Sequence, residues 1–96
     1  MNKELIEKSI LGTMIQENYL ITESQLQPYM FMGRYHAHIF DTMQKLVREE
    51  IVVDYLTLST RLEHTDALYV QYVTPSKMIR LNDLIFQTQI LPHHFI

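Results

Sequence analysis

Two helical patterns joined by a short link, within residues 26–62, constrain the fold more than any other feature of this sequence. In the first pattern apolar residues recur every three or four positions, which places them on one side of a helix that we expect over 34–49. The second pattern begins at Asp54, whose carboxylate can cap the free N–H groups of the next turn, and runs to about Glu63. The link 50–53 is too short for a strand, so we expect its side chains to plug the end of the core. The two stripes comprise Tyr35, Ile39, Phe40, Met43, Leu46 and Val47, and then Tyr55, Leu58 and Leu62.

Length and composition favour one small, all-α domain. The chain has 96 residues, of which 47% are hydrophobic, with Gly 2 and Pro 3, too few for a turn-rich β architecture or a linker. The absence of cysteine excludes a disulfide framework, a thiol nucleophile and a Cys-based zinc site. A net charge of -3 gives no overall attraction to nucleic acid or to an anionic membrane. The amphipathic N-terminus differs from a signal peptide, and no apolar run could span a membrane, so we expect a cytoplasmic protein.

A first helix is predicted over 3–17, with Glu7 largely off its apolar face. Gly12 lies inside this helix, where glycine costs about 1 kcal/mol relative to alanine. Its presence there favours the close approach of another helix. The apolar face comprises Leu5, Ile6, Ser9, Ile10, Thr13 and Met14.

The segment between the first and central helices carries turn signals. Thr22 and Gln25 have the spacing of a capping box, with Thr22 as the N-cap residue. Pro28 discourages helix at the residue before it and starts a short turn, whose side chains 29–31 should enter the core. Gly33 then releases the backbone before the central helix.

The architecture predicted from these patterns is a compact bundle of about five to six short helices. We expect 1–96 to be a single domain with a head over 3–73, in which Asp66 caps a short helix, 67–73. Ser76 is expected to cap a last helix over 77–91. The predicted core comprises Leu5, Ile10, Leu11, Met14, Phe31, Ile39, Phe40, Met43, Leu46, Leu58 and Leu62.

No reactive constellation is predicted, and we expect no catalytic residue, cofactor site or metal site. His36 and His38 are two positions apart, so on a helix they diverge by about 200° and cannot share one ion. His36 is therefore interpreted as a packed or capping residue, and His93 and His94 as part of a terminal tail. A helix-turn-helix interpretation is disfavoured because Arg61 is the one basic residue on the candidate recognition helix.

Three motifs give the chain a resemblance to the N-terminal domain of the DnaB-type replicative DNA helicase family. The first helix of that domain carries a Glu-x-x-aliphatic-Leu-Gly pattern. The second motif is a Leu-x-Pro-x-x-Phe segment followed by a His and an Ile-Phe pair in the next helix, and the third is an aliphatic-Asp-x-x-Thr-Leu element. The register holds without a gap over 26–62. The matching residues are Glu7, Ile10, Leu11 and Gly12, then Leu26, Pro28, Phe31, His36, Ile39 and Phe40, and finally Val53, Asp54, Thr57 and Leu58.

Departures from the family pattern limit what the resemblance implies. The family usually ends its third helix with a glycine, where Glu50 or Ile51 stands here. The segment 77–91 resembles the start of the family's late helical hairpin, but Gln87-Thr88-Gln89 replaces its arginine-rich continuation. The sequence contains no Gly-x-x-x-x-Gly-Lys-Ser/Thr phosphate loop, so these residues cannot form the ATPase motor.

The resemblance implies a non-catalytic protein-protein interaction module of DNA replication, which supports hexamer assembly and docks primase or a helicase loader. The alternatives are a stand-alone phage or mobile-element mimic that recruits or inhibits the host helicase, loader or primase, and a small helical DNA-binding regulator. Expected partners are helicase protomers, primase or loader, with self-association as a further option and weak or absent nucleic-acid binding. The candidate interface residues are Tyr69, Tyr72, Val73, Phe86, Ile90 and Phe95, which alternatively close the core over the first helix.

Overall fold

The computed structural model describes residues 3–75, and within them the chain forms helices and 3-10 turns. The predicted all-α bundle is thereby confirmed. The predicted last helix, 77–91, lies outside the described residues. In chain order the elements are α1 (Lys3–Gln16), α2 (Leu20–Glu23), the 3-10 turn η1 (Pro28–Met30), α3 (Arg34–Arg48), α4 (Tyr55–Arg61), α5 (His64–Tyr69) and the 3-10 turn η2 (Val70–Tyr72).

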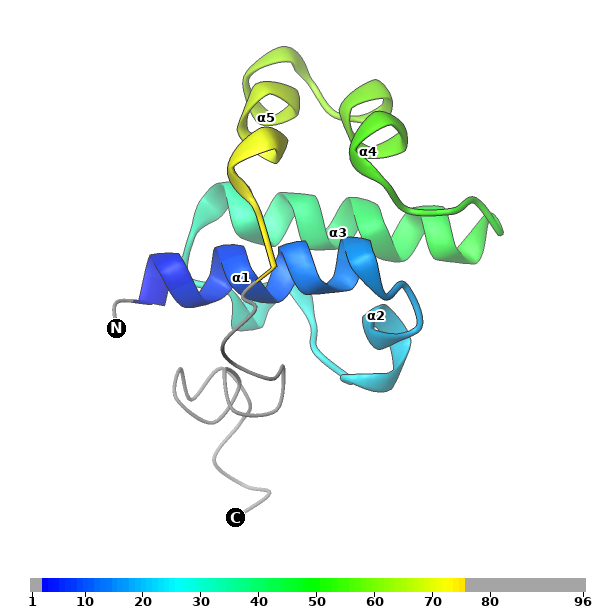
Figure 1. Cartoon of the computed structure of the whole chain (residues 1–96), viewed down its shortest axis with the longest axis horizontal. Helices are drawn as coiled ribbons and strands as arrows, with labels where there is room; N and C mark the ends of the chain where they lie inside the picture. The colour runs from blue at the N-terminus through cyan, green and yellow to red at the C-terminus, as the bar shows by residue number, and fades with distance from the viewer. Residues whose placement is uncertain (1–2, 76–96) are drawn as a thin grey trace.

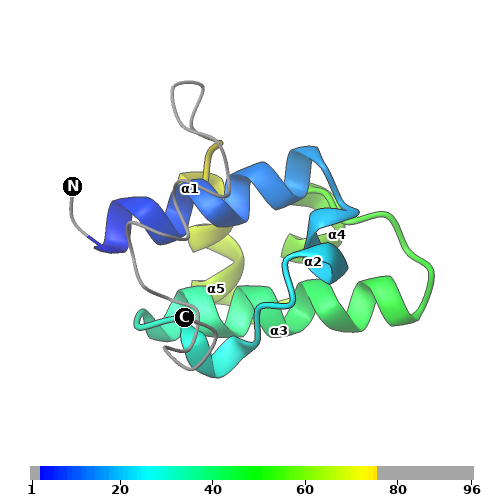
Figure 2. The same ribbon diagram turned by 90° about the horizontal axis from the view of Figure 1, so that it is seen from below.

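Helix α3 is the centre of the bundle. It lies beside α1, runs in the same direction, and also contacts α2, η1, α4 and α5 (Figures 1 and 2). The short helices α4 and α5 lie across one side of the α1–α3 pair, whereas α2 and η1 lie on the opposite side. The apolar face of α3 is therefore covered from several directions, as expected for a helix that organises the core.

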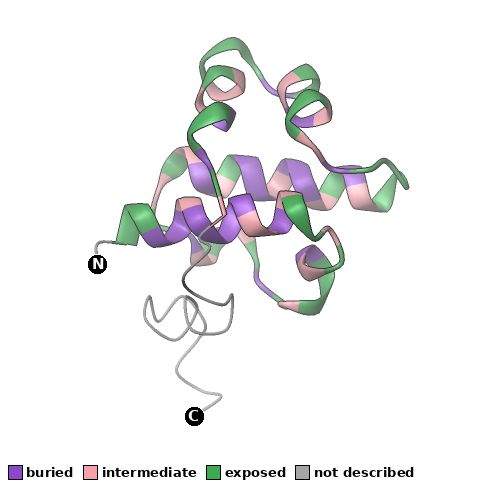
Figure 3. Cartoon of the chain, viewed as in Figure 1, coloured by how far each residue is buried: buried purple, intermediate pink, exposed green. Residues whose placement is uncertain are grey.

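The core lies between the facing sides of α1 and α3 and extends under α4 (Figure 3). The predicted core residues are buried, with one exception. Leu5 is 51% exposed, because the segment 73–75 covers its side of α1 only about two turns further on, at Gly12. The turn η1 forms as predicted and brings Phe31 against Phe40, with ring centroids 5.1 Å apart. The prediction that Tyr29 enters the core is wrong, since it is 77% exposed.

The close approach predicted at Gly12 is confirmed, although the neighbour is extended chain and not a helix. A Cβ atom at Gly12 would overlap the backbone of Thr74 and Pro75 where they cross α1. Tyr55 holds the same segment from the other side by donating its hydroxyl to the Val73 carbonyl at 2.8 Å. The glycine thus permits residues 73–75 to close the bundle.

Capping at α4 follows the prediction. The Asp54 carboxylate accepts the Thr57 N–H at 2.8 Å, and the Thr57 hydroxyl accepts the Asp54 N–H at 2.9 Å, a reciprocal capping box. Helix α4 ends at Arg61, slightly before the predicted end at Glu63. In the link before it only Val53 plugs the core as predicted, because the Val52 side chain is 70% exposed.

Two other predicted caps are wrong. Thr22 lies inside α2, whose first N–H groups donate to carbonyls of residues 17–19, so this helix continues the turn that ends α1 and needs no cap. Gln25 leaves it with a φ of 59°. Helix α5 begins at His64, ahead of Asp66, and the Asp66 carboxylate instead contacts the imidazole of His38 at 2.6 Å.

Candidate interaction surface

A buried polar network ties the beginning of α3 to α1 and α5. Glu7 on α1 is 1% exposed, and its carboxylate accepts the N–H groups of Met32 at 2.8 Å and Gly33 at 3.1 Å. The same carboxylate contacts the Nδ1 atom of His36 at 2.7 Å. The prediction that Glu7 lies off the buried face is therefore wrong, and the reason is that the carboxylate finds a full set of donors inside.

The geometry keeps Glu7 ionised in spite of its burial. Desolvation raises the pKa of a buried carboxyl, but here the hydrogen bonds from His36, Met32 and Gly33 outweigh it and hold the pKa of Glu7 below its ordinary value. The negative charge also faces the first turn of a helix of 15 residues, where the backbone dipoles favour an anion. The ionised side chain of Glu7 therefore links α1 to the beginning of α3.

His36 is a packed residue, as predicted, and its ring connects the hydrogen-bond network to α5. Its ring is 2% exposed, and its Nε2 atom lies 2.9 Å from the Tyr69 hydroxyl. Because a carboxylate only accepts hydrogen bonds, the ring donates its Nδ1–H to Glu7. This order of carboxylate, imidazole and hydroxyl is that of a nucleophilic relay, but burial raises the pKa of Tyr69 and the charges of Glu4 and Glu7 raise it further. The hydroxyl is thus held protonated, the opposite of an activated nucleophile.

An aromatic stack with a cation at each end stands on this network. The rings of Tyr35 and Tyr69 are stacked, with centroids 5.0 Å apart at 24°. The guanidinium of Arg34 lies 4.9 Å from the Tyr35 centroid, and the ammonium of Lys8 lies 5.8 Å from that of Tyr69. Tyr72, 58% exposed, packs on Tyr69 at 6.0 Å. Tyrosine and arginine are the residue types that dominate binding energy at protein interfaces.

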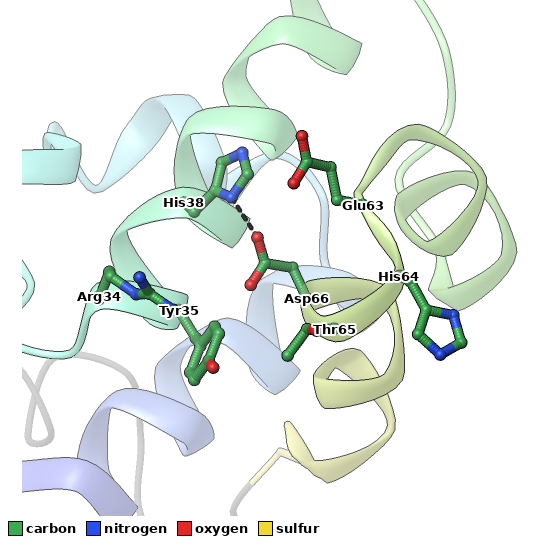
Figure 4. Close-up of a pocket in the computed structure, with 7 residues that line it drawn as sticks. All are labelled: Arg34, Tyr35, His38, Glu63, His64, Thr65 and Asp66. Atoms are coloured by element: carbon green, nitrogen blue, oxygen red, sulfur yellow. Dashed lines mark hydrogen bonds and ion pairs between the residues drawn. The ribbon is translucent and has the colours of Figure 1, made fainter.

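Two hollows meet at the ridge that Arg34 and Tyr35 form. One, of about 400 Å³, lies between the beginnings of α1 and α3, and Met32 and Tyr69 also line it. The other, of about 550 Å³, lies between α3 and α5 (Figure 4). The His38–Asp66 contact crosses the second hollow and joins its two walls. We call this surface, with Arg34, Tyr35, Tyr69 and Met32 at its centre, the ridge surface.

The predicted interface residues divide between this surface and the core. Tyr69 and Tyr72 lie on the ridge surface or at its edge. Val73 is 0% exposed, so its assignment to an interface is corrected: the crossing over α1 turns this side chain inward. Phe86, Ile90 and Phe95 lie outside the described residues.

Sequence reasoning missed Arg34 as a surface residue and treated Tyr35 only as part of a core stripe. The signal was weak, because the stack exists only once α5 brings Tyr69 against the first turn of α3.

Arg61, the one basic residue of the disfavoured recognition helix, donates two hydrogen bonds to the Glu49 carboxylate, at 2.8 and 2.9 Å. Within residues 3–75 no group of three His, Asp or Glu side chains is placed to hold a metal, and no helix is long and apolar enough to cross a membrane.

Comparison with known proteins connects this architecture to one family. No curated protein and no solved structure gives a match. A family model, described as the DnaB-like helicase N terminal domain, matches residues 2–86, which include every described element and all three motifs. The match is to the N-terminal domain and not to the ATPase domain of the helicase. The chain belongs to the DnaB-like helicase N terminal domain family.

Proposed function

We propose that this chain is a non-catalytic protein-protein interaction module of DNA replication, which associates with replicative helicase protomers and docks primase or a helicase loader. The observation that carries the proposal is the family match over residues 2–86. The structural roles of the motif residues support it. Glu7 and His36 link α1 to α3, Gly12 leaves room for the segment 73–75 to cross α1, and Asp54 caps α4. These contacts build a scaffold, in which Glu7 and His36 are committed to structural hydrogen bonds.

The surface composition supports docking over catalysis. Arg34, Tyr35 and Tyr72 present a guanidinium and aromatic edges on a scaffold that Glu7 and His36 hold in place. A rigid aromatic surface loses little side-chain entropy when a partner binds, which favours association without a large conformational change.

The test is size-exclusion chromatography with light scattering on the 96-residue chain, alone and mixed with the full-length replicative helicase, its loader and its primase. We expect a stable co-eluting complex with at least one of the three. A chain that elutes as the same species in every mixture would refute the proposed function. The chain is also mixed with duplex DNA. A complex with that DNA but with none of the proteins would replace the proposed function with that of a DNA-binding regulator.

The same experiment separates the collar module from a stand-alone mimic. A collar module should support assembly, so the helicase in the complex keeps its hexameric mass and its unwinding rate. A mimic occupies a docking surface of the host machinery, so it should displace the loader or primase, or change unwinding, in proportion to the amount added.

A further inference from the structure

Around the smaller hollow of the ridge surface the carboxylates have partners, whereas two of the cations have no ion-pair partner among the described residues. Lys3 and Arg34 line it, are exposed, and make no ion pair with any described residue. The carboxylates beside them are occupied: Glu7 by its three donors, and Glu4 by Lys8 at 3.5 Å. In a chain with a net charge of -3, this rim therefore carries two cations that have no ion-pair partner within residues 3–75.

The guanidinium of Arg34 is also held in position. It lies over the ring of Tyr35, which stacks on Tyr69, and the Tyr69 hydroxyl is fixed by His36. An arginine placed on an aromatic face keeps its N–H fork free while it loses side-chain freedom before any ligand arrives. Such preorganisation lowers the entropy cost of binding a carboxylate.

The floor beneath these cations is apolar. Met32, 71% exposed, and the edges of Tyr35 and Tyr69 line the hollow of about 400 Å³. Methionine adapts its shape to varied apolar groups, and the hollow is large enough for one bulky side chain. Positive charge at the rim above an apolar floor suits a ligand that carries a carboxylate next to an aromatic or aliphatic side chain.

We propose that the smaller hollow of the ridge surface binds an acidic segment of a partner protein, with a carboxylate of the segment on Arg34 and Lys3 and an apolar side chain against Met32 and Tyr35. This inference rests on the proposed function and deepens it, because it identifies the chemistry of the segment that docks. An acidic peptide fits this hollow better than nucleic acid, since two cations above an apolar floor can bind one carboxylate with its neighbouring side chain, whereas a phosphate backbone needs a longer row of positive charge.

The probe is a synthetic peptide in which Glu alternates with Phe and Leu, titrated into the ¹⁵N-labelled 96-residue chain and followed by NMR. We expect saturable shifts centred on the amides of residues 32–36 and of Tyr69. The matched peptide with Gln in place of Glu should bind about tenfold more weakly, and added salt should weaken the acidic peptide more than the neutral one. Equal binding of the two peptides, or shifts centred elsewhere, would overturn the proposal. So would a single-stranded oligonucleotide that shifts the same amides at lower concentration.

Charge reversal at the two ends of α3 provides the matched pair of variants. Arg34→Glu should weaken the acidic peptide by about tenfold or more, because it puts like charges together at the contact. Arg48→Glu, at the exposed last turn of the same helix, makes the same change in net charge and should leave the affinity within about twofold. Equal effects of the two variants would show that only net charge matters and would overturn the proposal. Circular dichroism of both variants confirms that they keep the fold.

The outcomes for this inference and for the proposed function are separable. If the peptide binds at Arg34 but no replication protein co-elutes with the chain, the acidic-segment site stands and the replication role fails. If a replication protein co-elutes and Arg34→Glu leaves that complex intact, the role stands and the docking site lies elsewhere.

Discussion

Replacing Glu7 with alanine should destabilise the fold more than any substitution of an exposed carboxylate. The change leaves the N–H groups of Met32 and Gly33 and the Nδ1–H of His36 without their acceptor. An unsatisfied buried donor costs about 1–3 kcal/mol. Water that enters beside the exposed Met32 relieves part of this cost, so we expect a loss of about 2–4 kcal/mol. That is a large share of the roughly 5–14 kcal/mol expected for a chain of this length.

Urea denaturation followed by circular dichroism measures this loss. Glu7→Gln retains the size of the side chain and one carbonyl oxygen, but it loses the charge and turns an amide group toward a donor, so it should cost about 1–2 kcal/mol. Glu17→Ala, at an exposed position just after α1, is the matched control and should stay within about 0.5 kcal/mol of the wild type. If Glu7→Ala were no more destabilising than Glu17→Ala, the buried network would not hold the bundle together.

The pH dependence of stability checks the same charge. The pKa of Glu7 is lowered in the folded state below its ordinary value of 4.5, so the folded protein favours the ionised form. Its contribution is present above pH 4.5 and is lost as the pH falls through the folded pKa. The difference in unfolding free energy between wild type and Glu7→Gln should therefore shrink as the pH is lowered from neutrality to below that range. A difference that stays constant over the whole range would show that the charge contributes nothing.

Three further predictions concern the backbone, all measured by urea denaturation. Glu50 and Gln25 adopt φ angles of 61° and 59°, so replacing either with glycine should stabilise the chain by about 0.5–1 kcal/mol, whereas Ser24→Gly, at a φ of -68°, should destabilise it. Gly12→Ala should cost about 1–3 kcal/mol or more, because the new methyl group overlaps backbone that cannot move aside like a flexible side chain; a neutral result would contradict the crossing over α1. Asp54→Ala should cost about 1 kcal/mol through loss of the capping box, and Asp54→Asn, which keeps an acceptor, should cost less.

The helical elements were predicted well from the sequence where the spacing of the apolar residues and the capping residues indicate the same boundaries. The boundaries of α3 and the cap at Asp54 follow from local rules, because the apolar stripe and the short carboxylate specify them without reference to distant residues. The predicted capping box at Thr22 failed for the converse reason. Its spacing was right, but the preceding turn had already supplied acceptors for the free N–H groups, so the helix began earlier.

The ridge surface could not be predicted from the sequence, because it depends on contacts between residues far apart in the chain. A helical stripe places Glu7 outside the apolar face by polarity, and nothing local indicates that His36 and the backbone just before α3 will bring three donors to it. Tyr35 similarly belongs to a core stripe until Tyr69 arrives from α5. The resemblance marked Glu7 and His36 as matching positions, but their contact and its consequence needed coordinates.

The departure of Glu50 from the family pattern has a physical consequence of the same kind. The backbone still takes the left-handed conformation that a glycine would adopt there, at a φ of 61°. The chain therefore accepts local strain to keep the link that delivers Val53 to the core, where the Asn18 side chain holds the Val53 backbone at both N–H and carbonyl. Tertiary contacts fix this turn against its local preference, as they do the charge of Glu7.

The buried network of Glu7 and His36 supports the exposed side chains of the ridge surface. Glu7 and His36 are committed to each other and to backbone groups, so neither is available for chemistry, yet together they fix the hydroxyl of Tyr69. Tyr69 in turn backs Tyr35, and Tyr35 carries Arg34. The residues that most resemble a catalytic relay thus act at a distance: they hold an exposed arginine and its aromatic support in one geometry. A docking surface needs that rigidity, because every side chain ordered in advance is one that a partner does not have to order.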